Sequence, residues 1–233
     1  MLVNHIRDLQ DIRKALYNNY ALSQDIDASE TEAWEEGKGF RPLKAPKGER
    51  GQPFSGDFDG NGYTISNLYI NRPDEDKVGL FGMSSGSQFH HNSIKNTNLK
   101  NIHVIGRQYV GGLVGWITNS NIERVSLAMS TVEGRYIVGG IIGTSAGIIA
   151  SKISADAETP IQAEQYSGSL FGTADDSVFF LYGIEIPCVP PKDKDKLYYK
   201  STIGYFTPLT TIYFPDASTI IDPRRSQEVP HEI

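Results

Sequence analysis

Two arginines and two tyrosines could together form a binding surface. Arg107 and Arg135 each follow a Val-x-Gly segment and stand 28 residues apart, at equivalent places of a repeated pattern. Tyr109 and Tyr136 lie beside them, one position out of register with each other. Stacked guanidinium and aromatic groups can hold sugars or an acidic protein surface. The alternative is a pair of solvated corner arginines whose aliphatic stems pack on their neighbours.

A second candidate is the pair His90 and His91. It lies within residues 83–93, where one repeat is about five residues longer than its neighbours. Segments inserted between regular elements frequently carry binding groups. A metal site would require a third ligand at suitable spacing, and none stands near the pair in the sequence. The histidines therefore belong either to a binding loop or to an ordinary solvated loop.

Clustered aspartates supply the third candidate. Asp57-Phe-Asp-Gly-Asn-Gly62 superficially resembles a calcium-binding loop, because oxygen ligands alternate around a glycine turn. The distal glutamate of an EF-hand is missing, so Asp57 and Asp59 are weak calcium candidates. Asp25 and Asp27 could come alongside them in a stacked fold. Four such carboxylates could serve a polysaccharide-active enzyme, although no position for its general base is evident.

Two further signals are expected to be structural. Gly82-Met-Ser-Ser-Gly86 has the G-x-S-x-G spacing of a hydrolase nucleophile, but no helical pattern follows it, so we expect an ordinary turn. Cys188 stands between prolines without a nearby histidine and is expected to be inert. As the one cysteine of the chain, it also excludes an internal disulfide.

These residues are positioned by a glycine-rich repeat. Val110-Gly-Gly-Leu-Val-Gly115 has one copy before it and two after it, and the closing glycines of consecutive copies are 33, 28 and 29 residues apart. A period in this range is typical of solenoids, in which each repeat is one structural unit. The other copies are Val78-Gly-Leu-Phe-Gly82, Val138-Gly-Gly-Ile-Ile-Gly143 and Ser167-Gly-Ser-Leu-Phe-Gly172.

Other segments repeat with the same spacing, 94–99 with 122–127 and 104–110 with 132–138. Three short β-type segments per repeat predict one coil of a right-handed parallel β-helix, with strands of successive coils roughly 4.8 Å apart. Glycines at the corners supply positive φ or the absence of a Cβ. Apolar residues should form inward ladders. Of an adjacent pair such as Leu113 and Val114, one must lie at a bend or face a covering element.

The chain, residues 1–233, is predicted to form a single all-β domain whose N-terminal cap covers residues 1–18. The cap contains an amphipathic helix at 5–17, with Asn4 as its N-cap residue, that covers the open end of the solenoid. Its apolar face comprises Ile6, Leu9, Ile12 and Leu16.

Coils are predicted over residues 19–177, starting with a strand at 20–27. A polar loop at 29–53 carries a short strand at 39–43. Residues 178–233 are predicted to contain a degenerate coil, an irregular C-terminal cap and a polar tail. Within them, Ile203-Gly-Tyr-Phe206 is a worn copy of Val-Gly-Leu-Phe.

Composition narrows the class of partner. The net charge of -6 and the lack of clustered Lys and Arg argue against nucleic acid. No apolar run approaches the roughly 20 residues that a membrane-spanning helix needs, so we expect no membrane insertion. The N-terminus lacks the apolar core of a secretory signal. We therefore expect a fragment, a processed form or a protein exported without a cleaved signal, if the chain is extracellular.

The glycine-rich copies resemble the GLUG motif, a repeat of bacterial surface and secreted proteins. Residues 54–68, Phe-Ser-Gly-Asp-Phe-Asp-Gly-Asn-Gly-Tyr-Thr-Ile-Ser-Asn-Leu, are similar to the segment that introduces such repeats, and residues 19–27 to the strand before it. The resemblance covers residues 5–172. It implies a right-handed β-helix like those of large adhesins, filamentous-haemagglutinin-like proteins and the non-catalytic parts of immunoglobulin A proteases. It also implies an extracellular or cell-surface location and carries over no catalytic residue.

We expect a non-enzymatic, adhesion-like binding module that presents a rigid face to a protein or glycan, because no nucleophile, base and orienting group come together in the sequence. One alternative is a polysaccharide-active β-helix enzyme that uses Asp25, Asp27, Asp57 and Asp59. The other is a structural spacer of a larger surface assembly. No cofactor is expected, with calcium as the weak exception.

Overall fold

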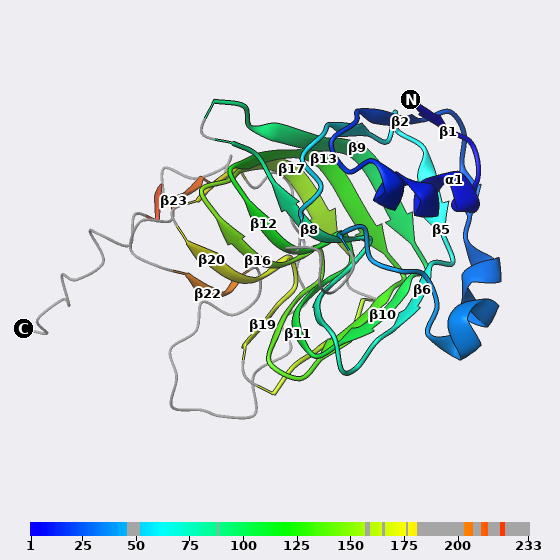
Figure 1. Ribbon diagram of the computed structural model, residues 1–233. Helices are drawn as coiled ribbons and strands as arrows, with labels where there is room; N and C mark the ends of the chain where they lie inside the picture. Colours follow the sequence, from blue (N-terminus) through cyan, green and yellow to red (C-terminus); the bar gives the residue numbers. More distant parts are fainter. Residues whose placement is uncertain are drawn as a thin grey trace, which may run out of the picture.

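The computed structural model describes residues 1–45, 52–87, 89–156, 159–164, 166–175 and 177–180, with the strands at 203–206, 211–213 and 220–221. Over these residues the chain winds into a right-handed parallel β-helix, as the repeat predicts. The coils stack along one axis, with the helices at the N-terminal end (Figure 1). Most of the predicted C-terminal cap and tail, and Cys188, lie outside the described residues.

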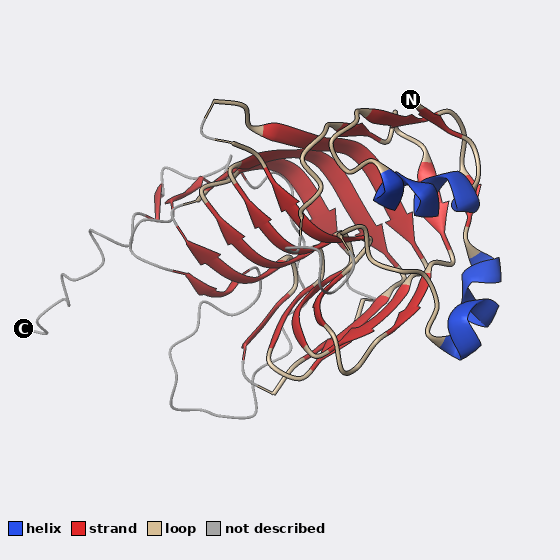
Figure 2. Ribbon diagram, in the orientation of Figure 1, coloured by secondary structure: helices blue, strands red, loops and turns tan. Residues whose placement is uncertain are grey.

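Four sheets form the walls of the helix (Figure 2). The long sheet contains β1 (Leu2–Val3), β2 (Tyr20–Leu22), β3 (Ile26–Asp27), β4 (Phe58–Asp59), β5 (Thr64–Ser66), β9 (Asn92–Lys100), β13 (Ser120–Ala128), β17 (Ile149–Ala155), β21 (Val178–Phe180), β23 (Thr211–Tyr213) and β24 (Ile220–Ile221). The second sheet contains β6 (Tyr69–Asn71), β10 (His103–Gly106), β14 (Thr131–Gly134) and β18 (Ile161–Gln162). The third contains β7 (Asp76–Val78), β11 (Gln108–Gly111), β15 (Ile137–Gly139) and β19 (Tyr166–Gly168). The fourth contains β8 (Phe81–Ser85), β12 (Val114–Thr118), β16 (Ile142–Ala146), β20 (Phe171–Asp175) and β22 (Ile203–Phe206).

Each regular coil therefore has four strands rather than the predicted three. The difference lies at residues 104–110, which divide at Arg107 into β10 and β11. Only Arg107 separates the two strands. The apolar residues on either side therefore have the spacing expected of one continuous strand. Arg107 consequently stands at the corner between the second and third sheets.

The register between coils follows the repeat. Ile122 pairs with Ile94, Leu127 pairs with Leu99, and Val110 pairs with both Val78 and Val138, so the predicted alignment is confirmed. The copy at 203–206 also joins the fourth sheet as β22. There the pairing differs, because Phe171 lies opposite Ile203 and not opposite Phe206 as the sequence alignment predicted.

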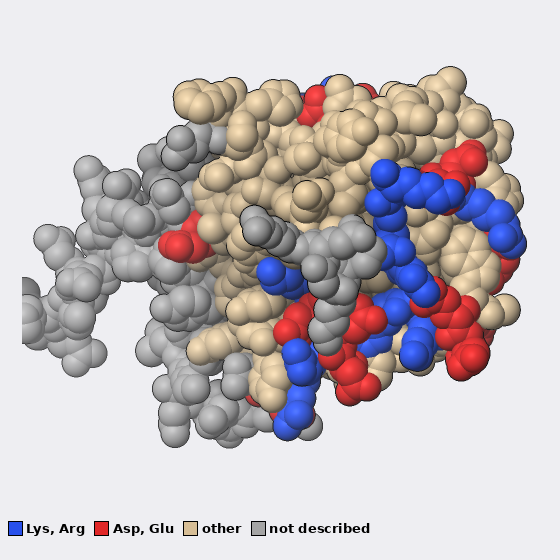
Figure 3. Space-filling view, viewed as in Figure 1, with Lys and Arg blue, Asp and Glu red and all other residues tan. Residues whose placement is uncertain are grey.

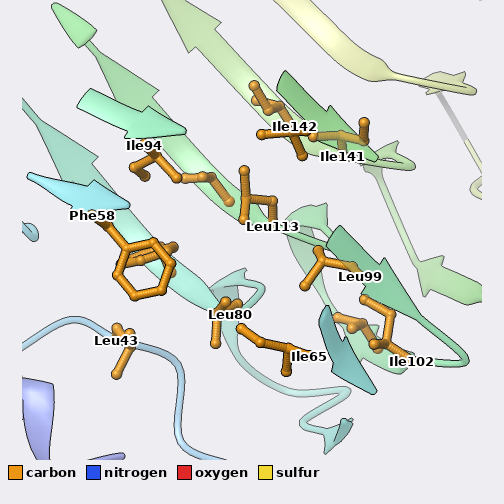
Figure 4. Packing of buried hydrophobic residues seen from close by; sticks show 14 of the residues in the cluster. Leu43, Phe58, Ile65, Leu80, Ile94, Leu99, Ile102, Leu113, Ile141 and Ile142 are labelled. Atoms are coloured by element: carbon orange, nitrogen blue, oxygen red, sulfur yellow. The ribbon is translucent and has the colours of Figure 1, made fainter. Parts of the chain in front are cut away.

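Inward apolar ladders fill the interior, as predicted. Figure 4 shows Ile94, Leu99 and Leu113 of one coil and Ile141 of the next coil within one core. Leu113 and Val114 are both fully buried. This is possible because Leu113 lies in the bend before β12, while Val114 begins that strand.

The repeated glycines of the fourth sheet are required for close approach, not for positive φ. A Cβ added to Gly115 would lie 2.6 Å from the backbone nitrogen of Val78 and 2.7 Å from the carbonyl oxygen of Tyr109. Gly143, one coil later, would meet the nitrogen of Val110 at 2.7 Å. Real Cβ atoms do not approach backbone this closely, so the wall between the third and fourth sheets can close only around glycine.

The N-terminal helix is shorter than predicted. It comprises α1 (Ile6–Asp11) followed by one 3₁₀ turn, η1 (Ile12–Lys14). His5, not Asn4, is the N-cap residue, because its side chain accepts the Arg7 amide hydrogen. The backbone nitrogen of Asn4 instead donates to the Asp8 carboxylate (3.0 Å). The predicted apolar face is buried and packs on the first coils, so the helix caps the solenoid.

Within the segment predicted as a loop at 29–53, the described residues 29–45 are more ordered than their polar composition indicates. Ser29–Gly37 form the 3₁₀ helix η2, which is kinked at Trp34. Phe40 and Leu43 are fully buried. No strand forms over the described residues 39–43; Gly39 makes an isolated antiparallel bridge to Ile70.

We predict that Gly115→Ala lowers the free energy of unfolding by about 1–3 kcal/mol or more, because the new methyl group must displace backbone of the neighbouring sheet. Urea unfolding followed by circular dichroism measures this. Thr118→Ala, at an outward position of the same strand, should cost at most about 1 kcal/mol. Equal effects of the two substitutions would contradict the close-approach explanation.

Candidate binding surfaces

The predicted arginines do lie on consecutive coils at one corner, where the Arg135 amide donates to the Arg107 carbonyl (2.9 Å). Their side chains pair with acids in opposite directions along the axis. Arg107 donates to both carboxylate oxygens of Asp76 in the preceding coil, at 2.7 Å each. Arg135 Nε lies 3.5 Å from a carboxylate oxygen of Glu164 in the following coil. Both guanidinium groups are thus already partnered within the protein.

The tyrosines of this corner play different parts. Tyr136 lies under the Arg135 guanidinium, 5.1 Å from the ring centroid, which is a cation–π distance. Tyr109 adopts a positive φ of 57°, as does Lys77 at the equivalent place of the preceding coil. Figure 3 shows basic and acidic side chains interleaved over this part of the molecule and the helical end. The corner is a charge-balanced surface and not a positive patch.

The histidine pair lies at a different corner, between the fourth sheet and the long sheet. His90 and His91 are exposed in the connection from β8 to β9, which is the inserted segment. The backbone nitrogen of His90 donates to Ser87 Oγ (3.0 Å). The histidines and the arginines are therefore on separate edges of the coil and do not form one site.

The serine of the G-x-S-x-G segment faces inward. Ser84 lies in the middle of β8, not in the expected turn, and is fully buried. Its hydroxyl accepts from the side chain of Asn92 (2.9 Å), which is also buried. This arrangement is unlike an exposed nucleophile on a strand-to-helix turn.

The four aspartates are not brought together. Asp57 and Asp59 flank Phe58 in β4, whereas β3, which carries Asp27, pairs with β5. Asp25 Oδ1 accepts from the backbone nitrogen of Thr64, and Asp27 Oδ1 from the Asn67 amide. The suggestion that Asp25 and Asp27 lie beside Asp57 and Asp59 is therefore wrong.

Asp59 is fixed by three neighbours. One carboxylate oxygen accepts from the Asn61 backbone and the Asn96 side chain, both at 2.8 Å, and the other lies 3.4 Å from Lys95 Nζ. Burial raises the pKa of the Asp59 carboxyl, but these hydrogen bonds and the lysine charge outweigh it, so the pKa lies below its ordinary value. The part of the chain that the structure describes holds no group of three His, Cys, Asp or Glu side chains suited to a metal ion. Calcium binding by Asp57 and Asp59 stays a prediction.

A polar ladder on the outer face of the long sheet was not predicted. Asn96, Arg124 and Lys152 occupy equivalent places in β9, β13 and β17, and all three have φ near +52°. Each kinks its strand, so the inward, buried residues are three apart at this point instead of two. Asn96 donates to Asp59 and accepts from Arg124 Nε (2.5 Å), which links three coils on the surface.

Two hollows adjoin this ladder. The first, which we name the axial groove, is about 370 Å³ and is lined by residues that include Leu2, Ala21, Asp57, Asp59, Ser93 and Lys95. The second, the amide hollow, is about 380 Å³ and is lined by Asn61, Gly62, Asn96, Asn98 and Arg124. The hydrogen bond between Asn96 and Asp59 joins a residue that lines the amide hollow to one that lines the axial groove.

Part of the lining of the axial groove forms a column along the solenoid axis. Leu2, Ala21, Asp59 and Lys95 pair in succession across β1, β2, β4 and β9. Ala21 and Ser93 have short side chains, so the surface is lowest between the longer ones. For the polar ladder, the signal in the sequence was the spacing of the apolar residues after Ile94 and Ile122. The axial groove gave no such signal, because the strands that line it are irregularly spaced along the sequence.

Comparison with known proteins gives partial matches. No protein-family model matches the chain. Halomucin of Haloquadratum walsbyi is 40% identical over 120 residues, which are 49% of this chain and 1% of that protein. A glycine-rich membrane protein of Evansella cellulosilytica is 30% identical over 133 residues, 54% of this chain and 14% of that protein. The chain thus spans a small part of the length of these relatives.

One solved structure is also similar. A Bacteroides ovatus protein assigned as an immunoglobulin A1 protease superposes with a TM-score of 0.49 at 15% sequence identity, covering 88% of this chain and 83% of that one. Within the described part of this chain, no helix has the length and apolar character needed to cross a membrane.

We predict that Asp76→Asn destabilises the protein at neutral pH, because Arg107 loses its charged partner. Hydrogen bonds from Arg107 lower the pKa of the Asp76 carboxyl. Its stabilising contribution is therefore complete above the unfolded carboxyl pKa of about 3.9 and is lost as pH falls through the folded value. The difference in unfolding free energy between wild type and variant should shrink below about pH 4.

Asp74→Asn is the matched control, since it removes the same charge two residues away. It should have a smaller effect in urea unfolding at neutral pH. A difference between wild type and Asp76→Asn that persists undiminished at low pH would show that the ion pair is not its cause.

Proposed function

We propose that this chain is a non-enzymatic binding module of a larger surface or secreted protein, and that it binds a protein or glycan partner through the outer face of its long sheet. This proposal rests on the two hollows beside the hydrogen-bonded side chains of Asp59, Asn96 and Arg124. A rigid stack of coils holds these side chains at fixed spacing, so little ordering is required when a partner binds.

The surface assignment draws on two sources. The glycine-rich copies resemble the GLUG motif of surface and secreted proteins, and one of the partial relatives is named as a membrane protein. The matched relatives are far longer than the matched segment, which is consistent with a module within a larger protein. An extracellular or cell-surface location follows from the proposal.

The proposal of binding without catalysis draws on the state of the carboxylates. A general acid or base works best when its pKa lies near the operating pH. The pKa of Asp59 is displaced away from neutrality, and its oxygens already accept hydrogen bonds and an ion pair. These contacts suit a carboxylate that organises a surface.

The assignment of the binding face is tested with two variants that change net charge equally. Lys95→Glu with Arg124→Glu alters the long-sheet face, and Arg107→Glu with Arg135→Glu alters the arginine corner. We expect the first variant to lose binding on protein and glycan arrays at least tenfold, and the second to keep it. Circular dichroism melting curves check that both variants fold.

Loss of binding in the corner variant alone would move the binding face to Arg107, Tyr109, Arg135 and Tyr136. An array on which the folded wild-type chain binds nothing would favour the structural spacer.

A second candidate function has one specific observation in its favour. Asp57, Asp59 and Lys95 line the same hollow, as the catalytic groups of a polysaccharide-active enzyme would. We expect no product when the chain is incubated with linear polysaccharides and assayed for new reducing ends and for unsaturated sugars. Product formation that Asp57→Asn with Asp59→Asn abolishes would establish the enzyme instead.

A further inference from the structure

We infer that the axial groove binds a linear, uncharged glycan lying along the solenoid axis. This inference rests on the proposed function and names the partner class of the same face. Four of the residues that line the groove, Leu2, Ala21, Asp59 and Lys95, are paired in register and form a column across four strands. This column is perpendicular to the strands, so a ligand lying along it would follow the solenoid axis.

The distance between neighbouring strands along the groove is similar to the length of one unit of an extended sugar chain. Neighbouring strands in a sheet are roughly 4.8 Å apart. One pyranose unit of an extended β-linked chain spans a similar length, so consecutive units would meet equivalent positions of consecutive strands. An extended peptide, whose side chains on one face repeat at roughly 6.6–6.8 Å, would drift out of step with the strands.

The chemistry of the groove suits the two kinds of surface on a sugar. Leu2, which is 68% exposed, and Ala21 provide apolar surface at the N-terminal end, on which the C–H face of a pyranose can pack. Asp57, Asp59 and Lys95 stand along the groove and can exchange hydrogen bonds with hydroxyl groups. Hydroxyl groups are both donors and acceptors, so they can pair with carboxylate and ammonium groups alike.

The charge of the face favours an uncharged ligand. Three carboxylates, Asp57, Asp59 and Glu123, stand among three cations, Lys95, Arg124 and Lys152, on this face. Lys95 pairs with Asp59, while Arg124 and Lys152 both pair with Glu123. An acidic polysaccharide would meet Asp57 and Asp59 directly, which costs binding energy through repulsion.

The test uses an NMR titration of the isotope-labelled chain with cello-, manno- and xylo-hexaose as neutral probes and galacturonate hexamer as the acidic probe. Ala21→Phe fills the groove with an outward side chain and leaves the charge unchanged. Ala128→Phe is its matched control, at an outward position of the same sheet away from both hollows. The expected result is saturable binding of at least one neutral hexaose, weakened at least tenfold by Ala21→Phe and unchanged by Ala128→Phe.

Three results would overturn the inference, and they differ in what they say of the proposed function. Preferential binding of the galacturonate hexamer would overturn the uncharged class alone. Absence of hexaose binding, with an array partner still lost in Lys95→Glu with Arg124→Glu, would leave the binding module but remove the glycan. Absence of both would remove the proposed function as well.

Discussion

The structure depends on coils that stack in register. At the corner between the third and fourth sheets, the backbones approach too closely for any side chain larger than that of glycine. Parallel backbone pairing holds Val78, Val110 and Val138 above one another, and the same pairing aligns every outward residue into columns. Glycines at 115 and 143 allow the third and fourth sheets to meet backbone to backbone. The columns of outward residues exist because the coils stack in register. The candidate binding surfaces are therefore a consequence of that stacking.

Much of the fold could be predicted from the sequence, because equivalent residues of successive repeats indicate which residues pair between coils. The pairs Ile94 with Ile122 and Leu99 with Leu127 could be aligned by hand and are confirmed. The number of strands in a coil could not be predicted from the sequence, because the corner at Arg107 is made by one residue and interrupts no apolar pattern. The buried positions of Phe40 and Leu43 were also missed, because a polar segment surrounds them and their partners lie in the next coil.

The candidate site was harder to predict than the fold. Arg107 and Arg135 were correctly placed on one corner, but their partners Asp76 and Glu164 come from the coils on either side, and pairing across coils is set by side-chain geometry. The axial groove joins Ala21, Asp59 and Lys95, whose separations in sequence differ from one step to the next. A hollow forms there because small residues of different coils lie between larger ones, and the sequence of a single repeat does not show this arrangement.

We place the binding site on the outer face of the long sheet because two hollows lie there, and not at the corner of Arg107 and Arg135, whose guanidinium groups pair with Asp76 and Glu164. The measurement that tests this most directly is a crystal structure of the chain soaked with a neutral hexaose. We predict sugar density along Leu2, Ala21, Asp59 and Lys95, with one pyranose unit at each strand and the axis of the sugar chain perpendicular to the strands. Density at the corner of Arg107 and Arg135, or a sugar chain lying parallel to the strands, would contradict it.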